Sequence, residues 1–312
     1  MNRFKNILAI CSDSLGCDDV IEQASALARA NGAKLSLISF ERAASSWRKE
    51  QIKRLRRIAS TIDHAGGLEV ETRLVGGVPS ESIVREVSKH RHDLVIMSRE
   101  IEDTWSGSLF GGTARKIMKS CPCPVWFLSP GQNVPFKRVL AVVDPCLDGN
   151  EDRALNIKIL EIASALATAH GAALHIVHAW EVDGKDYDTV HSEIRPQNRE
   201  SLLRKHADKR QNGIFDLLDS VQGDDFDFEI HLPRAAPLRA YSDIAADLSI
   251  DVMVMRAGNM SNLSFLLGGT LAETLLNSVS CSLLTVTPDR AETSTVFDRK
   301  TAFGAARQAA AE

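Results

Sequence analysis

The sequence predicts an α/β fold in which one domain plan occurs twice, each copy having a five-stranded parallel sheet with helices on both faces. Short apolar segments alternate with segments of helical periodicity, which is typical of parallel sheets joined by right-handed crossovers. Segments of the first part also recur, in the same order, in the second part. The 312 residues are enough for two domains that each bury a core of their own.

The internal repeat is carried by three pairs of segments. They are 4–10 (FKNILAI) with 136–142 (FKRVLAV), 31–35 (NGAKL) with 170–174 (HGAAL), and 93–97 (DLVIM) with 251–255 (DVMVM). Their order is preserved and the separation between partners grows along the chain. This pattern indicates a tandem duplication with insertions in the second copy.

A stretch that contains Pro and Gly, residues 129–135, separates the two copies and has the composition of a linker. We therefore expect a first domain at 1–130 and a second domain at 136–290. The remaining residues, 291–312, are rich in Ala, Thr and charge, and we expect a flexible C-terminal tail.

Local signals place the elements of the first copy. A helix at 18–30 carries Ala24, Leu27 and Ala28 on one face. Pro79 favours the start of a later helix, because its missing N–H is not needed there. The expected strands are 6–11, 34–40, 68–75, 94–98 and 124–128, and the expected helices are 18–30, 44–64, 81–90 and one that begins at the Gly-Gly-Thr of 111–113.

The second copy repeats the plan with a longer crossover after its second strand. That crossover, 182–223, contains Pro196, so we expect a short helix and then a longer one at about 200–221. A second Gly-Gly-Thr precedes a helix at 270–277. The expected strands are 138–143, 173–179, 227–232, 251–255 and 282–287.

Composition narrows the classes of function. Hydrophobic residues make up 44% of the chain, and the longest apolar runs are far shorter than a membrane span. The N-terminus lacks the cleavage site of a signal peptide, so we expect a cytoplasmic protein. A net charge of −4 gives no electrostatic footprint for nucleic acid, and the six cysteines lack zinc-site spacing. We therefore expect the protein to bind a small-molecule ligand, and not to bind a membrane, a nucleic acid or a metal ion.

Two further motifs carry a resemblance to a known family. Residues 77–83, GVPSESI, look like its Gly-x-Pro turn before a helix, and residues 121–125, CPCPV, look like its Pro-Cys-Pro-Val entry to a fifth strand. With the order of elements, they make the chain resemble the universal stress protein family over residues 4–288, specifically its tandem two-domain E-type members. The resemblance implies adenine-nucleotide-alpha-hydrolase-like domains whose fifth strands pair antiparallel as an internal pseudo-dimer. A further homodimer stays open.

The candidate site lies in the second copy, where a strand runs into the second Gly-Gly-Thr helix start. Free amides at such a start favour an anion such as phosphate. In ATP-binding members of the family an Asp after the first strand faces the nucleotide, and Asp144 matches it; a lone carboxylate there can also be a turn residue. The expected ligand-binding residues are Asp144, His178, Met255, Arg256, Gly258, Asn259, Gly268, Gly269 and Thr270.

The glycine pattern of ATP-binding members is altered before this helix. In those members the fourth strand ends in Gly, two residues, Gly, nine residues, and then Gly with Ser or Thr. Arg256 and Asn259 stand at the first two glycine positions, although Gly258 and Gly268, each one residue earlier, keep the nine-residue spacing. Asn tolerates a positive φ better than most residues, whereas Arg cannot replace a glycine that lets phosphate approach the backbone. Arg256 therefore either contacts an anion through its guanidinium or blocks the site.

The first copy departs further from the pattern. It keeps only the Gly-Gly-Thr of 111–113, and the acidic loop at 100–103 repels phosphate. We therefore expect the first copy to be a structural partner of the second.

Histidine and tryptophan candidates also have structural interpretations. His178 lies near the carboxyl end of a strand, where ligands of parallel sheets bind, but His175 points to the opposite face, so the two do not share a metal. Trp180 can stack on a base, although burial under a loop is the commoner role. His90 and His92 lie at the other end of the sheet and are expected to be solvated.

Three functions stay open at this point. The expected one is a non-catalytic stress-response protein that binds a small ligand in its second domain, with ATP as one candidate and no required cofactor. The first alternative is an ATP-binding protein with slow hydrolysis or self-phosphorylation. The second alternative is a structural adaptor whose sites are both vestigial.

Overall fold

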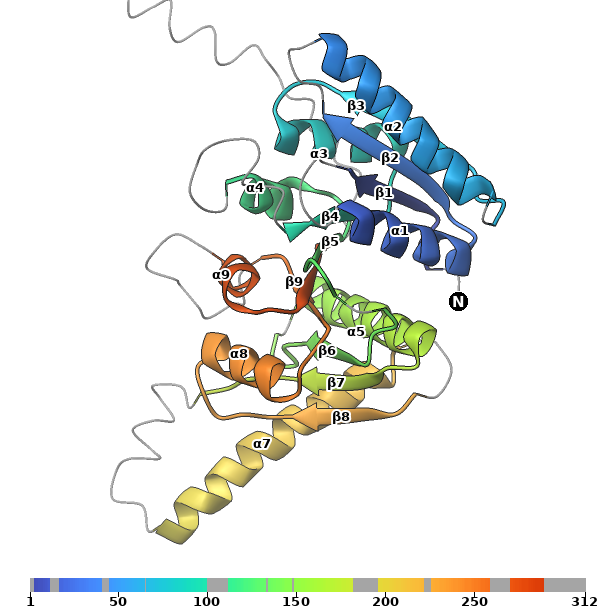
Figure 1. Ribbon diagram of the computed structural model, residues 1–312. Coiled ribbons are helices and arrows are strands. Elements are labelled where there is room, and N and C mark those ends of the chain that lie inside the picture. The colour runs from blue at the N-terminus through green and yellow to red at the C-terminus, as the bar shows by residue number, and fades with distance from the viewer. Residues whose placement is uncertain are drawn as a thin grey trace, which may run out of the picture.

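The chain folds as an α/β protein with one ten-stranded sheet between two layers of helices (Figure 1). The computed structural model describes residues 3–11, 17–40, 45–64, 66–99, 112–132, 134–147, 149–181, 196–221, 226–258 and 270–288.

The sheet consists of two parallel halves that meet at their fifth strands. The strands are β1 (Asn6–Ile10), β2 (Lys34–Phe40), β3 (Val70–Val75), β4 (Leu94–Ser98), β5 (Val125–Leu128), β6 (Arg138–Val142), β7 (Ala173–Val177), β8 (Phe228–His231), β9 (Val252–Arg256) and β10 (Ser282–Val286). Their spatial order is β3-β2-β1-β4-β5-β10-β9-β6-β7-β8. Among the strand pairs of the described residues, only β5–β10 is antiparallel. The expected pair of five-stranded parallel sheets is therefore confirmed, and the two are joined into one.

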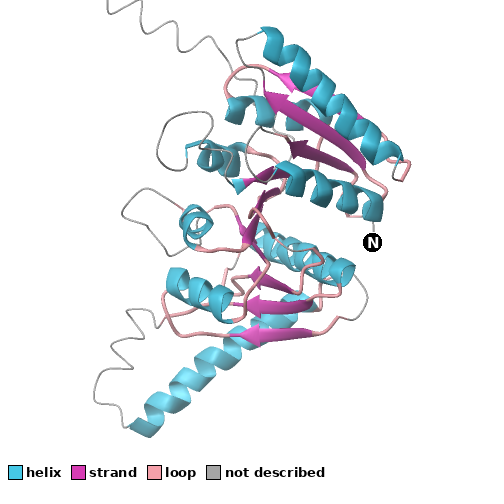
Figure 2. Ribbon diagram, viewed as in Figure 1, coloured by secondary structure: helices cyan, strands magenta, loops and turns pink. Residues whose placement is uncertain are grey.

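Helices cover both faces of this sheet, as the sequence predicts (Figure 2). One face carries α1 (Cys17–Asn31), α2 (Ser45–His64), α5 (Asn150–His170) and α7 (Pro196–Leu218). The other carries α3 (Pro79–His90), α4 (Gly112–Ser120), α8 (Pro237–Asp247) and α9 (Leu271–Ser278). Because the central strands are covered on both sides, they are built from nearly continuous apolar runs such as Leu94–Ser98, whereas the edge strands β3 and β8 are partly exposed.

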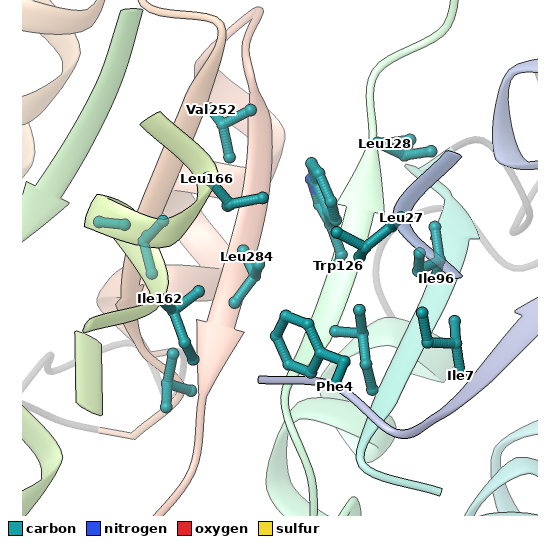
Figure 3. Packing of buried hydrophobic residues seen from close by; sticks show 14 of the residues in the cluster. Phe4, Ile7, Leu27, Ile96, Trp126, Leu128, Ile162, Leu166, Val252 and Leu284 are labelled. Carbon is teal, nitrogen blue, oxygen red and sulfur yellow. The ribbon is translucent and has the colours of Figure 1, made fainter. Parts of the chain in front are cut away.

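The hydrophobic core on each face of the sheet runs through both halves. On the α1 and α5 side, Trp126 of β5 lies opposite Leu284 of β10, and both side chains are fully buried. Figure 3 shows Trp126 and Phe4 on the first-half side of this junction, with Leu284 and Ile162 on the second-half side. The antiparallel pairing that the resemblance implied is thus present, and it removes the exposed edges of β5 and β10.

Polar contacts also tie the two halves together. The guanidinium of Arg99, directly after β4, donates to the carbonyl of Val279 at 2.8 Å and to that of Leu276, so a first-half cation holds the carboxyl end of α9. Between the two adjacent helix starts, Arg115 of α4 lies 3.5 Å from Glu273 of α9.

Element boundaries differ from the sequence prediction at a few places. The long second-copy helix begins at Pro196 and not near residue 200, since a proline is tolerated in the first turn. Helix α9 begins at Leu271, with Thr270 as its N-cap. The short helix expected earlier in that crossover falls within 182–195, which lies outside the described residues. The expected tail at 291–312 also lies outside them.

The expectation that His90 and His92 are both solvated is wrong for His92. Its side chain is buried, and its Nδ1 lies 3.0 Å from Oδ1 of Asn6. The Asn6 amide nitrogen donates to the carbonyl of His90 at 2.7 Å, which fixes Oδ1 as the atom facing His92. Since that oxygen can only accept, His92 carries its proton on Nδ1.

Candidate functional site

The candidate site occupies the carboxyl edge of three neighbouring parallel strands in the second half. Asp144 follows β6, His178 follows β7, and Arg256 is the last residue of β9. The register pairs β6 with both β7 and β9, so these three positions share one edge of the sheet. Loops at the carboxyl ends of strands are where open parallel sheets bind their ligands.

Asp144 is held in place through its backbone by the buried side chain of Asn156 in α5. Its N–H donates to Asn156 Oδ1 at 3.1 Å, and the Asn156 amide nitrogen donates to its carbonyl at 2.8 Å. Its carboxylate, 13% exposed, accepts the N–H of Cys146 at 3.1 Å, which is the contact of an Asx turn. The turn role considered from the sequence is therefore present. Within the described part of the chain, Oδ2 has no hydrogen-bond partner and can accept one from a ligand.

His178 is a buried, neutral imidazole beside Asp144. Its Nδ1 lies 3.1 Å from the carbonyl of Val143 and 3.8 Å from Oδ1 of Asp144. The carbonyl can only accept, so Nδ1 carries the proton. Burial lowers the pKa of His178, and the neighbouring Asp144 carboxylate offsets part of that effect.

Cys146 brings a thiol close to this pair. One ligand atom each from Asp144, Cys146 and His178 lie within 4.8 Å of one another, so the three are placed where they can share a cation. Sequence reasoning missed this grouping, because Cys146 shows no metal-site spacing. The only signal was its position two residues after Asp144.

Arg256 forms an ion pair within the protein. Its guanidinium lies 2.7 Å from Oδ1 of Asp152 in the first turn of α5, and the side chain is mostly buried. Helix α5 covers the sheet face opposite to that of α9, so this ion pair holds the guanidinium on the far side of the sheet from the start of α9.

Thr270 caps α9 in a reciprocal arrangement with Glu273. The Glu273 N–H donates to the Thr270 hydroxyl at 3.2 Å, and the Thr270 N–H donates to the Glu273 carboxylate at 3.1 Å. This capping box satisfies two amides and places a negative charge at the helix start. Sequence reasoning missed Glu273, although Thr-Leu-Ala-Glu at 270–273 is the signature of such a box.

Two of the other expected site residues, Met255 and Gly258, do not contribute to this edge cluster. Met255 is fully buried in the core on the α9 side of the sheet. Gly258 is exposed, and a Cβ there would meet open space. Asn259, Gly268 and Gly269 lie outside the described residues.

Trp180 is covered by the protein. It is buried, its indole N–H donates to the carbonyl of Leu232 at 3.2 Å, and the Arg210 guanidinium lies 4.5 Å from its ring centroid. Burial is therefore its role in this structure, because α7 occupies a ring face that a base would need.

Comparison with known proteins decides the family. The model of the universal stress protein family matches the chain twice, at residues 3–129 and 135–287. The chain belongs to the universal stress protein family. The two matches make it a tandem member, as the resemblance predicted.

Several relatives align with most of this chain. It is 24% identical over 243 residues to universal stress protein E of Escherichia coli K12, an alignment that covers 74% of this chain and 72% of the relative. Among solved structures, a functionally unknown protein from Pseudomonas aeruginosa PAO1 aligns with a TM-score of 0.71 at 18% identity, covering 92% and 94% of the two chains. A universal stress protein from Archaeoglobus fulgidus aligns with a TM-score of 0.60 at 16% identity, covering 90% and 98%. No helix in the described part of the chain has the length and apolar character needed to cross a membrane.

Proposed function

We propose that this protein is a non-catalytic stress-response protein that binds a small, hydroxyl-bearing ligand at the carboxyl edge of its second half. The ligand class is a nucleoside or nucleotide, bound through its sugar. The proposal rests on Asp144, a rigidly held carboxylate with one oxygen available at the end of a parallel strand. A hydrogen bond from a hydroxyl to such a charged acceptor contributes about 1.5–3 kcal/mol.

The helix start favours a nucleoside over a triphosphate. The Glu273 carboxylate occupies the first turn of α9, where phosphate oxygens would otherwise gain from the helix dipole. The guanidinium of Arg115 lies 3.5 Å from this carboxylate and offsets part of its charge, whereas that of Arg256 is held by Asp152 on the other face of the sheet. The Glu273 cap and the Arg256–Asp152 ion pair argue against phosphoryl chemistry and support binding without turnover.

Isothermal titration calorimetry with adenosine, ADP and ATP, each with and without Mg²⁺, tests the proposal. We expect adenosine to bind at least as tightly as ATP. In Asp144→Asn, which keeps the contact to Cys146 but loses the charge, we expect affinity to fall by roughly 10- to 100-fold. Asp243→Asn, an equal change of charge at an exposed residue of α8, should bind as the unchanged protein does. Absence of heat and of any thermal shift at millimolar ligand would refute nucleoside binding.

A structural adaptor is the second candidate, and the capping box favours it because the protein caps its own helix start. Native mass spectrometry of the purified protein separates the two candidates. A bound mass that is lost in Asp144→Asn supports the ligand-binding function. A bare chain that also fails to take up any added nucleoside supports the adaptor.

A further inference from the structure

The outer edge of the second half brings two imidazoles and a carboxylate together on β7 and β8. The parallel register places His175 opposite Glu229 and Val177 opposite His231. Glu229 and His231 are two residues apart on β8, so their side chains leave the same face of the strand. His175, being paired with Glu229, leaves that same face of β7. The backbone register alone therefore gathers the three side chains.

Their separations match those of ligands around one metal ion. His175 Nδ1 lies 3.1 Å from His231 Nε2 and 3.4 Å from Glu229 Oε2. One ligand atom from each residue lies within 4.8 Å of the other two. Two ligands bound at about 2.0–2.1 Å in tetrahedral geometry lie roughly 3.3–3.4 Å apart. An ion can therefore be accommodated with small side-chain movements.

The cluster is buried at His175 and open to solvent at Glu229. His175 is buried, and in the described residues its Nε2 has no hydrogen-bond partner, so the polar contacts of its ring are those that Nδ1 makes with His231 and Glu229. The Glu229 side chain is 66% exposed. Strand β8 is the last strand of the sheet, so an ion and its remaining water ligands can reach the cluster from solvent.

We propose that His175, Glu229 and His231 bind a divalent transition-metal ion such as Zn²⁺, with at least one coordination position left to water. Two imidazoles and one carboxylate form a donor set that zinc and its neighbours prefer over Ca²⁺ or Mg²⁺. The ion links the edge strand β8 to β7. The site is separate from the Asp144 edge, because His178 is an odd number of residues from His175 and contacts Val143 instead.

Calorimetric titration of ZnCl₂ into the chelator-treated full-length protein tests this site. We expect one equivalent to bind at the cluster, and His231→Gln to weaken that binding by at least 10-fold. Glu229→Gln, which keeps the size of a side chain that is 66% exposed, should weaken it as well. Cys146→Ser, which changes the other group of ligand atoms, should leave it intact. Circular dichroism before metal addition confirms that each variant is folded.

The absorption spectrum of bound Co²⁺ shows which ligand atoms coordinate the ion. Binding at the proposed site should give visible d–d absorption without a thiolate-to-cobalt charge-transfer band, and His231→Gln and Glu229→Gln should reduce it. The proposal is overturned if neither ion binds at micromolar concentration. It is equally overturned if a thiolate band appears and binding is lost in Cys146→Ser but unchanged in Glu229→Gln, because the ion would then lie at Asp144, Cys146 and His178.

Discussion

Glu273 adds a negative charge at the start of α9, the helix that follows the family's glycine pattern in the sequence. Its carboxylate lies within the first turn of α9, where the partial positive charge of the free amides is greatest. Arg115 lies 3.5 Å from that carboxylate and offsets part of its charge. We expect the remaining charge to compete with a ligand phosphate but not with a neutral sugar.

Glu273→Gln tests this competition at a single residue. Glutamine retains the reciprocal cap of Thr270, so the helix start keeps its geometry while losing the charge. We expect ATP affinity to rise about two- to five-fold, the effect of a 0.3–1 kcal/mol dipole interaction, and adenosine affinity to stay constant. Calorimetry with both ligands is the measurement, and an equal change for both would show that the charge does not act on phosphate.

His92 provides a pH prediction outside the candidate site. Burial, followed by the nearby Arg73 cation, lowers its pKa to about 4, so the unfolded chain, with a pKa of about 6.5, takes up the proton first. The contribution of neutral His92 to stability is complete above pH 6.5 and is lost as pH falls towards 4, by about 3 kcal/mol. NMR titration of the His92 ring, assigned with His92→Gln, should give a midpoint well below 6; a midpoint near 6.5 would contradict burial.

At the residue scale, the sequence located Asp144 but not the contacts that give it its role. The family resemblance leads to that position, because an Asp after the first strand is a local pattern of its ATP-binding members. The partner of Arg256 could not be predicted, since Asp152 is far away in sequence and meets it only through the docking of α5 on the sheet. The role of Glu273 was readable from its spacing to Thr270.

At the scale of elements, α7 is held close to the Asp144 loop by a glycine. A Cβ built on Gly213 would lie 2.9 Å from Cβ of Pro145, which is closer than side chains approach one another. The glycine therefore lets the helix backbone pack against the loop that follows β6.

Gly213→Val should separate α7 from this loop. The control is Asn212→Val, which introduces the same β-branched side chain at an exposed neighbouring residue. Because of overpacking, we expect Gly213→Val to lower the free energy of unfolding by about 1–3 kcal/mol more than this control does. Urea unfolding of both variants is the measurement. Equal losses would show that helix propensity alone, and not the contact with Pro145, is responsible.

The strand bounds were predicted to within two residues, because a strand buried on both faces must be continuously apolar. The segments 34–40 and 94–98 match β2 and β4 in both bounds. Helix ends were less certain, since a proline such as Pro196 permits a start at its own position, and the choice depends on what the helix packs against.

For the whole molecule, the two halves share one sheet and one pair of cores. Trp126 lies at their junction, opposite Leu284 and with its ring centroid 5.8 Å from that of Phe136. Because the core on each face is continuous across this line, we expect both halves to unfold in a single transition.

Trp126→Ala tests that cooperativity. Removing the buried indole should cost about 3–5 kcal/mol, while Trp126→Phe should cost much less, since no described residue bonds to the indole N–H. Chemical unfolding followed by far-UV circular dichroism should show one transition for each variant. Two separate transitions in the unchanged protein would contradict the shared core.

The central claim is that a hydroxyl-bearing ligand binds the second half at Asp144, and amide NMR during an adenosine titration tests it most directly. The Cys146 N–H donates to the Asp144 carboxylate and therefore reports on that side chain. We predict saturable shifts at Cys146 and Val143, none at the carboxyl edge of the first half, and their loss in Asp144→Asn. Shifts confined to the first half, or shifts that persist in Asp144→Asn, would contradict the account.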